Sequence, residues 1–432
     1  LTFKMKIKTI TRSKVEQKKQ TKYELPKLER NLDPALHPFA VEREYARALN
    51  AAKLEKLFAK PFVAAMSGHL DGIYCLRRHP TDIKTFLSGS FDGGVRVWNV
   101  ANRQTKWSLT AHDACVRGVV VCSDNESFLT CSDDKTVKRW RLETSDDNDT
   151  STRAKDSVLS SWSSQSAFTD IDVQRASSKF VTSGSTVELW DLNRSDSLSS
   201  YDWGVDSYIG VKFSPVEKDV FASLATDRGI LLYDVRTNSI LRKCVLPMRS
   251  NKIVWNPMEA FNFTVANEDH KLYTFDMRNL SKASVIHKGH VGAVLSLDYS
   301  PTGREFVSGS YDTTIRIFPH TSSRSRAVYH TQRMQRVFAT QFTGDAQFVL
   351  SGSDDGNIRV WKSKASAPLR IVSKREKKSI QYRDTLRKKF RHMPEVARIE
   401  RHQHLPKAIY KKREIEIVST AATRKRESNK AK

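Results

Sequence analysis

The chain has 432 residues and carries 73 Lys and Arg against 48 Asp and Glu, a formal charge of +25 that is too high for an ordinary cytosolic enzyme. Hydrophobic residues make up 39% of it, yet no run of about 18 apolar residues occurs and the N-terminus lacks the apolar stretch of a signal peptide, so we expect neither membrane spanning nor secretion. The five cysteines form no C-x-x-C pair, which indicates reduced thiols inside the cell and argues against a disulfide scaffold or a zinc finger.

The positive charge is concentrated at the two ends of the chain. Residues 1–60 hold 15 basic and 7 acidic side chains, residues 363–432 hold 22 and 7, and residues 61–362 hold 36 and 34. We therefore predict a nearly neutral domain over 61–362, between a basic N-terminal arm over 1–60 and a basic C-terminal domain over 363–432. Lys and Arg displace condensed counterions from nucleic acids, so this asymmetry indicates a partner rich in phosphate.

The N-terminal arm has two parts. Residues 2–22 are polar and basic, so we expect them to be extended until they bind a partner; Met5 opens the stretch MKIKTITRS, and we expect residues 1–4 not to be native sequence. Over 38–58, Pro38 precedes apolar residues that include Val41, Tyr45 and Leu49. The sequence predicts a helix here that packs on the central domain or on a neighbour.

A short pattern recurs through residues 61–362: an apolar strand, S-G-S or a variant, an Asp, a second apolar strand and an aromatic residue. Clear copies are SGSFDGGVRVWN (88–99) and SGSDDGNIRVWK (351–362). The aromatic anchors are Trp98, Trp140, Trp190, Tyr233, Phe275, Phe318 and Trp361. Their spacings of 42, 50, 43, 42, 43 and 43 residues are typical of a four-stranded propeller blade.

At these residues the chain resembles the WD-repeat family, which implies an all-β fold, a seven-bladed propeller over about 61–362. Each blade is apolar on both faces and is stable only between neighbours, so we expect the ring to close. Residues 61–66 have the length of one strand and precede the first repeat, and we predict that they complete the last blade. The long third spacing indicates a polar surface loop at 144–157.

Polar residues recur in register with the anchors. By the resemblance, they form a hydrogen-bonded network of His, Ser or Thr, Asp and Trp within a blade. The expected members are His69, Ser88, Asp92 and Trp98; His112, Thr130, Asp134 and Trp140; His290, Ser308 and Asp312; and Asp355 and Trp361. Phe318 replaces Trp in the sixth repeat, so its network should be one hydrogen bond short.

The same residues also invite comparison with a hydrolase triad of His69, Ser88 and Asp92. The set recurs at His112 and Asp134, and one enzyme needs no second triad, so we favour the structural interpretation. No Walker-type or strand-linked G-x-G-x-x-G loop occurs. We predict a non-catalytic protein with no cofactor, no metal site and no small-molecule substrate; a metal role for His392, His402 and His404 is disfavoured because they lack i, i+4 spacing.

The C-terminal domain shows helical rather than repeat periodicity. Tyr382, Leu386 and Phe390 are spaced i, i+4, i+8 and predict a helix over about 376–391 with one apolar stripe. Pro394 suits the first turn of a second helix, with Val396 and Ile399 on one face and its end near His404. We expect an amphipathic element that rests its apolar edge on the propeller or a partner and presents cations outward.

The tail resembles one family in particular. The stretch 391–411 contains R-H-M-P-E-V, then R-I, R-H, H-L-P-K and I-Y-K, and is similar to the tail domain of the Sof (suppressor of fibrillarin) family of nucleolar WD-repeat proteins. The opening MKIKTITRS and residues 29–62 are also similar to that family. The resemblance implies a scaffold in the nucleus and nucleolus, a component of the small-subunit processome that contains the U-three guide RNA and processes pre-ribosomal RNA. Its implied partners are pre-ribosomal RNA, guide RNA and other processome proteins.

The basic residues of the tail are the candidates for contact with RNA or a partner protein. They are Lys374, Arg375, Lys377, Lys378, Arg383, Arg387, Lys388, Lys389, Arg391, His392, Arg398, Arg401, Lys411, Lys412 and Arg413. Runs of Lys and Arg neutralise phosphates but do not address base edges, so we expect binding without sequence specificity. The clusters at 374–378, 387–389 and 424–426 are also candidates for nuclear import.

A second interpretation makes the propeller a substrate receptor of a cullin-type ubiquitin ligase. Propellers with a W-D-x-R ending serve that role, and this chain has Y-D-V-R at 233–236 and F-D-M-R at 275–278. Arg236 and Arg278 would contact the ligase adaptor, although another aromatic replaces Trp in both motifs. We favour the alternative that both arginines are ordinary exposed strand-end residues.

Overall fold

The computed structural model describes residues 39–142, 158–175, 177–204 and 206–430. The predictions for residues 2–22 and for the loop at 144–157 fall outside the described residues. The chain divides into two compact units. Among the described residues, one unit holds 39–53 and 373–397, and the other holds the propeller together with 54–60, 363–372 and 398–430. The expected division of the chain at residues 60 and 362 stays a prediction.

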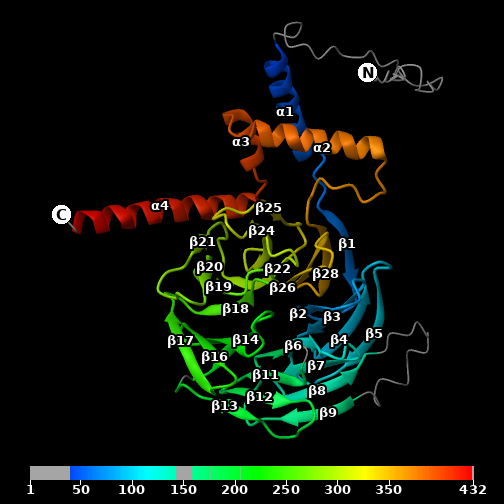
Figure 1. The fold of residues 1–432 in the computed structure, drawn as a ribbon, viewed down its shortest axis with the longest axis vertical. Helices are drawn as coiled ribbons and strands as arrows, with labels where there is room; N and C mark the ends of the chain where they lie inside the picture. The colour runs from blue at the N-terminus through cyan, green and yellow to red at the C-terminus, as the bar shows by residue number, and fades with distance from the viewer. Residues whose placement is uncertain (1–38, 143–157, 176, 205, 431–432) are drawn as a thin grey trace, which may run out of the picture. The chain divides into compact units, whose positions relative to one another are not determined.

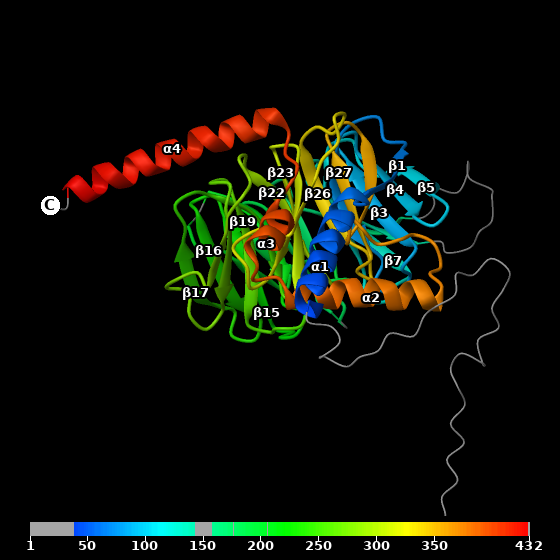
Figure 2. The same ribbon diagram turned by 90° about the horizontal axis from the view of Figure 1, so that it is seen from above.

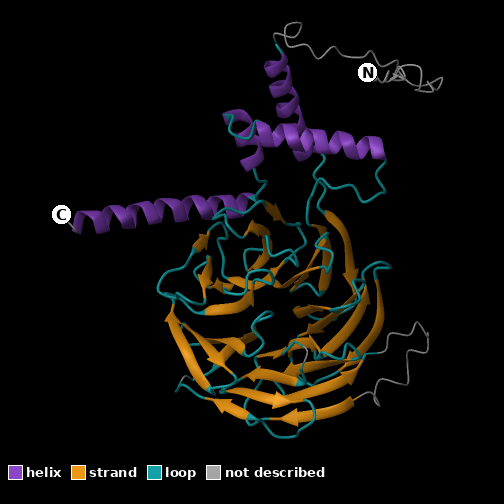
Figure 3. Ribbon diagram, in the orientation of Figure 1, coloured by secondary structure: helices purple, strands orange, loops and turns teal. Residues whose placement is uncertain are grey.

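The second unit contains seven antiparallel sheets of four strands around a centre, which confirms the seven-bladed propeller (Figures 1 and 3). Blade 1 consists of β2 (Ile73–Arg78), β3 (Thr85–Ser90), β4 (Gly94–Asn99) and β5 (Gln104–Thr110). Blade 2 consists of β6 (Val116–Val121), β7 (Ser127–Ser132), β8 (Thr136–Arg141) and β9 (Val158–Ser163). Blade 3 consists of β10 (Asp170–Val173), β11 (Lys179–Ser183), β12 (Val187–Asp191) and β13 (Ser199–Tyr201).

Blades 4 to 7 follow in chain order around the ring. Blade 4 consists of β14 (Tyr208–Phe213), β15 (Val220–Ala225), β16 (Gly229–Asp234) and β17 (Ser239–Val245), and blade 5 of β18 (Ser250–Trp255), β19 (Asn262–Asn267), β20 (Leu272–Asp276) and β21 (Val285–His287). Blade 6 consists of β22 (Val294–Tyr299), β23 (Glu305–Ser310), β24 (Ile315–Pro319) and β25 (Ala327–Tyr329). Blade 7 consists of β26 (Val337–Phe342), β27 (Phe348–Ser353) and β28 (Asn357–Lys362) together with β1 (Phe62–Ser67).

The core lies between the sheets. Every residue of β3 and of β7 is buried, because both faces of these middle strands are covered. One apolar cluster joins Leu232 of blade 4 to Ile253 of blade 5, and another joins Val307 of blade 6 to Val349 of blade 7. A blade therefore depends on its neighbours for burial of its apolar faces, as expected for a repeat architecture.

The N-terminal strand completes the last blade, as predicted. β1 pairs antiparallel with β28, with Ala65 opposite Arg359 and Met66 opposite Ile358. The Phe62 ring also packs edge-on against the Trp361 ring, with centroids 5.6 Å apart. Since β28 would otherwise be an open edge, this pairing closes the ring.

The first unit is built from helices. α1 (Ala40–Leu57) and α2 (Lys374–Lys389) cross each other, as both views show (Figures 1 and 2), and α3 (Pro394–Arg401) begins in this unit. Ala48 of α1 packs on Leu386 and Phe390, whereas Tyr382, the third residue of the predicted stripe, is 47% exposed. These two stripe residues pack on α1 of the same chain, where the sequence led us to expect the propeller or a partner. On α1 the predicted face is wrong at Val41, which is 62% exposed. The small side chains of alanine are buried there instead, because they let the two helices approach closely.

The rest of the tail holds a helix that the sequence did not predict. The second tail helix, α3, ends at Arg401 rather than near His404, and α4 follows from Lys407 to Lys430. Ile409 is buried at the start of α4, but most of its other side chains are exposed. The helix carries little apolar periodicity, so its sequence contains no stripe that would indicate a helix.

The second blade holds a complete polar network. His112 Nδ1 lies 2.7 Å from Asp134 Oδ2, and its Nε2 lies 2.7 Å from Thr130 Oγ1. Trp140 Nε1 donates to the same hydroxyl over 2.9 Å. Thr130 Oγ1 accepts the indole N–H of Trp140, so its hydroxyl proton can be donated to His112 Nε2. The proton of the neutral His112 ring then lies on Nδ1, which donates it to the Asp134 carboxylate. Burial lowers the pKa of His112, so the neutral ring is the form that fits.

The other blades keep parts of this network. In blade 1, His69 and Trp98 meet at Ser88 Oγ, whereas Asp92 accepts the backbone N–H of Gly94 over 2.8 Å. In blade 6, His290 contacts Ser308 and Asp312, and Phe318 supplies no indole donor.

In blade 7, Trp361 donates to Ser351 over 2.8 Å. Asp355 pairs with Arg359 instead of a histidine. Hydroxyl groups therefore recur as acceptors of the anchor indole, while the partner of the Asp varies from blade to blade.

Replacing Thr130 with Val should lower the free energy of unfolding by about 1–3 kcal/mol, because His112 Nε2 and Trp140 Nε1 both lose a buried partner. Urea denaturation followed by tryptophan fluorescence measures this change. The same substitution at the exposed Thr321 is the control and should leave the midpoint unchanged. Equal stability of both variants would contradict a contribution of the network.

The free energy of unfolding should fall as the pH is lowered from about 6.5 to about 4. Burial lowers the pKa of both His69 and His287 to about 4. Below pH 6.5 the unfolded chain therefore binds protons at these residues that the folded chain refuses, which favours unfolding. Denaturation at several pH values should show a shallower dependence for His287→Gln than for the wild type, and an unchanged one for the exposed and non-titrating Thr321→Val.

Candidate nucleic-acid and partner interfaces

The predicted contact residues lie on two compact units. α2 carries most of them, α3 carries Arg398 and Arg401, and α4 carries Lys411, Lys412 and Arg413. The exposed members on or next to α2 are Lys374, Arg375, Lys377, Lys378, Arg383, Lys388, Lys389, Arg391 and His392. Cationic side chains at intervals along exposed helices fit a polyanion better than they fit a compact ligand pocket.

Local interactions start and stabilise α2. The Ser373 side chain accepts the N–H of Glu376 over 3.3 Å and caps the N-terminus, where Glu376 also complements the helix dipole. The last turn carries Arg387, Lys388 and Lys389, which complement the dipole at the other end. The basic surface of this helix is therefore compatible with its own stability.

The structure identifies side-chain partners of Arg387 and Lys389 in the first unit. Arg387 is largely buried and its Nη2 lies 2.5 Å from Asp384 Oδ1. Lys389 Nζ lies 2.7 Å from Glu44 Oε2 on α1, so it links the two helices. Tyr45 Oη also donates to Glu395 over 3.0 Å. Arg387 and Lys389 therefore stabilise the helical unit, and the sequence could not distinguish them from the exposed Lys388.

The histidines of the tail do not assemble into a metal site. His404 packs its ring near His330, with centroids 5.5 Å apart, and burial lowers the pKa of His330. No group of three His, Cys, Asp or Glu side chains suited to a metal ion occurs within the described ranges. The described helices also include none that is both long and apolar enough to cross a membrane.

Arg236 and Arg278 lie at the ends of β16 and β20, on exposed loops. Arg278 forms two hydrogen bonds to Asp276, of 2.9 and 3.1 Å, and its guanidinium stacks over the Phe261 ring at 4.3 Å. Arg236 Nε lies 3.5 Å from Asp234 Oδ1 and 3.7 Å from Asp219 Oδ2, and its side chain is 73% exposed. The anchors Tyr233 and Phe275 are buried, and both arginines are exposed just beyond the ends of their strands.

The centre of the propeller holds a charged cavity of about 390 Å³ that the sequence did not indicate. Asp172 of blade 3 contacts Arg77 of blade 1 at 2.8 Å and Lys212 of blade 4 at 2.5 Å. Lys252 of blade 5 reaches Asp170 at 2.8 Å. Burial lowers the pKa of Lys212 to about 8. These pairs join residues 95, 40 and 82 positions apart in the chain. Their only signal in the sequence was charge within otherwise apolar strands.

Comparisons with known proteins match both parts of the chain. Residues 363–432 match the Sof1-like domain, and residues 60–99, 103–141, 282–318 and 326–362 match the WD domain, G-beta repeat. Protein SOF1 of Saccharomyces cerevisiae is 44% identical over 444 residues, which covers 98% of this chain and 91% of that protein.

Two further relatives carry the name DDB1- and CUL4-associated factor 13. The one from Dictyostelium discoideum is 48% identical over 426 residues, 98% of this chain and 95% of that protein. The one from Homo sapiens is 46% identical over 428 residues, 99% and 95% of the two chains. Because the likeness includes the propeller and the tail together, the chain belongs to the Sof family of WD-repeat proteins.

Proposed function

We propose that this protein is a non-catalytic scaffold of the small-subunit processome, the nucleolar particle in which guide RNA and pre-ribosomal RNA are assembled. In this role it supports pre-ribosomal RNA processing and maturation of 18S ribosomal RNA. Membership of the Sof family supports the proposal, as does the likeness to Protein SOF1. The protein acts in the nucleus and nucleolus, and its partners are the two RNAs and other processome proteins.

The observation that carries the proposal is the distribution of charge. The residues of the propeller hold 36 basic and 34 acidic side chains, and many of those at its centre are paired with each other. The tail holds 22 basic and 7 acidic side chains, and exposed helices present most of the basic ones. The propeller thus offers protein-binding surfaces, while the tail neutralises phosphates of the RNA.

A second candidate function is substrate reception for a cullin-type ubiquitin ligase. The name shared by several relatives supports it, and so does the exposure of the Arg236 side chain, which is 73%. The pairing of Arg278 with Asp276 weighs against it, since an adaptor would have to compete with a bidentate ion pair. The two functions do not exclude each other, because they use different surfaces.

Reversing four exposed cations of α2, with Lys377, Lys378, Arg383 and Lys388 changed to Glu, should weaken RNA binding and assembly into the particle. These side chains make no ion pair within the described residues, so the propeller should melt as before. If six to eight tail cations contact phosphates, the slope of log affinity against log salt is about −4 to −7 for the wild type and shallower for the variant. Fluorescence anisotropy with a short RNA measures both quantities.

The matched control reverses four exposed cations of the propeller, Lys84, Lys218, Lys282 and Arg304, and so changes the net charge by the same amount. It should keep most of the RNA affinity and salt dependence. Equal losses in the two variants would show that net charge alone, rather than the tail, determines binding.

Affinity purification of the tagged full-length protein from nuclear extract should recover pre-ribosomal RNA, guide RNA and processome proteins. Ribonuclease treatment should release the RNA and the proteins held through it, and leave directly bound propeller partners in place. The variant Arg236→Ala tests the second function, because it should lose only a ligase adaptor. Recovery of the adaptor without RNA or processome proteins would refute the scaffold function.

A further inference from the structure

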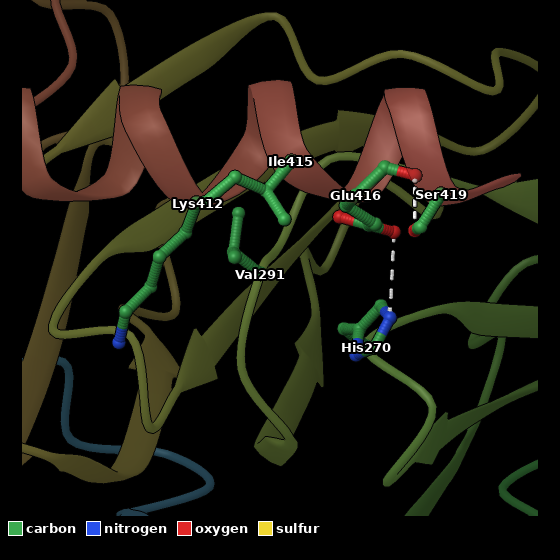
Figure 4. Close-up of a pocket in the computed structure, with 6 residues that line it drawn as sticks. All are labelled: His270, Val291, Lys412, Ile415, Glu416 and Ser419. Atoms are coloured by element: carbon green, nitrogen blue, oxygen red, sulfur yellow. Dashed lines mark hydrogen bonds and ion pairs between the residues drawn. The ribbon is translucent and has the colours of Figure 1, made fainter.

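The last helix of the chain, α4, meets the propeller on one side. Figure 4 shows Lys412, Ile415 and Glu416 of α4 above Val291 and His270, where they line a cavity of about 340 Å³. Glu416 Oε1 lies 3.4 Å from His270 Nε2. This contact defines the side of α4 that is turned towards the propeller.

The other side of α4 carries apolar side chains that nothing in the described part of the chain buries. Successive helical residues are rotated by about 100°, so Val418, two residues after Glu416, points about 200° away from the propeller contact. Ile417 is 58% exposed and Val418 is 68% exposed. Ala421 and Ala422 follow one turn later and are exposed as well. These four residues, 417, 418, 421 and 422, form the outer face of α4.

The outer face is unusual because the helix buries so little elsewhere. Ile409 is buried in the first turn, but among residues 410–430 only Glu416 is even partly buried. Ile409 and Val418 are separated by about two and a half helical turns and so lie on opposite sides of the helix. In proteins most of the stability of a helix comes from packing of its apolar residues, so the outer face indicates a docking surface.

The charge of α4 limits what can cover this face. The helix contains eight Lys or Arg and three Glu. Three of its cations, Arg424, Lys425 and Arg426, follow the outer face directly and are exposed. An aliphatic surface that runs into a cationic one is complementary to a partner that is apolar and acidic.

Other parts of this protein fit the outer face poorly. Two copies of α4 paired in parallel would bring residues 424–426 of both copies together, and an antiparallel pair centred on the outer face would bring them close to the basic run at 411–413. Residues 1–38 hold ten basic and four acidic side chains and would be repelled in the same way. Residues 143–157 are acidic, but Ala154 is their only hydrophobic residue.

RNA fits the cations of α4 but not its outer face. Bases stack on aromatic rings or on guanidinium planes, whereas Ile417 and Val418 offer neither a planar surface nor a hydrogen-bond donor. An RNA strand bound at residues 424–426 would therefore leave the aliphatic side chains in water. The observations favour a protein as the occupant.

We propose that α4 docks an acidic amphipathic helix of another protein. The apolar stripe of that helix packs on the outer face, and its Asp and Glu side chains pair with Arg424, Lys425 and Arg426. Two helices can interlock their side chains along such a seam, and charges beside the seam determine partner and orientation, as in coiled coils. That the partner is another processome protein rests on the proposed function, whereas the docking surface does not.

Site-specific crosslinking of the tagged full-length protein in cells tests the docking surface. A benzophenone amino acid replaces Val418, and mass spectrometry identifies the segment to which it is linked. We expect a segment of another protein with apolar residues at i, i+3 and i+4 spacing and more acidic than basic residues. A link to RNA, to a second copy, to residues 1–38 or to a basic segment would overturn the proposal, as would the absence of any link.

The matched control places the same crosslinker at Ile83, an apolar residue of the propeller that is 54% exposed. It should not yield the segment found from position 418. Recovery of the same segment from both positions would show that any exposed apolar site captures it, which counts against a specific surface.

A synthetic peptide of the crosslinked segment then measures the affinity by fluorescence anisotropy. The double variant Ile417→Ser and Val418→Ser should bind it about tenfold more weakly or worse, because both side chains lose their apolar contact. Its melting temperature should not change, since both residues are exposed in the unbound protein. Ile83→Ser should keep the full affinity, and an unchanged affinity in the double variant would contradict the docking surface.

Charge reversal provides a second, independent variant. With Arg424, Lys425 and Arg426 changed to Glu, the peptide should bind more weakly and the dependence of its affinity on salt should become shallower. An affinity that does not respond to this reversal would show that the partner is not held by its acidic residues.

A last comparison separates this inference from the proposed function. The double variant Ile417→Ser and Val418→Ser removes no charge, so it should bind a short RNA with the affinity and salt dependence of the wild type. Equal losses of peptide and RNA affinity would overturn the outer face as a separate protein-binding surface. The ribonuclease purification tests the scaffold function, and its failure would leave the peptide measurement unaffected.

Discussion

The pairing of β1 with β28 is the constraint on which the rest of this protein depends. It joins residues nearly 300 positions apart in the chain, and it removes the open edge that blade 7 would otherwise present. The pairing extends beyond the strands, because Lys362 N donates to the carbonyl of Pro61 over 2.8 Å and Lys60 N to that of Ala365 over 3.2 Å. The N-terminal and C-terminal extensions therefore leave the ring at neighbouring points, although they come from opposite ends of the sequence.

This common origin explains why one helix from each extension can form a unit. α1 and α2 bury Ala48, Leu386 and Phe390 against one another, and the Glu44–Lys389 ion pair joins them at the surface. A basic helix without such a partner would be a marginal structure in water. Leu386 and Phe390 are buried inside the helical unit, which leaves the remaining faces of α2 for exposed cations.

The propeller handles charge in a different way from the tail. Its polar groups are mostly placed where a neighbour satisfies them, as in the set of His112, Thr130 and Trp140 and in the central pairs of Asp172. Such pairing costs little only when the geometry is complete, since a buried group left without its partner destabilises the fold. Arg316 of β24 departs from this pattern, because its buried Nε and Nη2 have no hydrogen-bond partner among the described residues.

The sequence by itself determined the number of blades, their anchors and the completing strand at 61–66, because a propeller repeats one local pattern at a fixed period. It also determined α2, since Tyr382, Leu386 and Phe390 form an unbroken stripe. It placed the buried face of α1 on large residues such as Val41, whereas alanines are buried, because the close approach of α2 selects small side chains. It did not reveal α4, which has scarcely any apolar stripe to detect.

Only the tertiary structure decided which charges are used and which are free. Arg387 and Lys388 are adjacent and equivalent in sequence, but Arg387 is held by Asp384 while Lys388 is exposed. Arg77, Asp172 and Lys212 belong to three separate blades, and closure of the ring brings them together. Likewise, Asp312 cannot serve Arg316 because four donors from its own blade occupy it first. Local periodicity fixes secondary structure, whereas the partner of a charged side chain depends on contacts between distant segments, which no local pattern records.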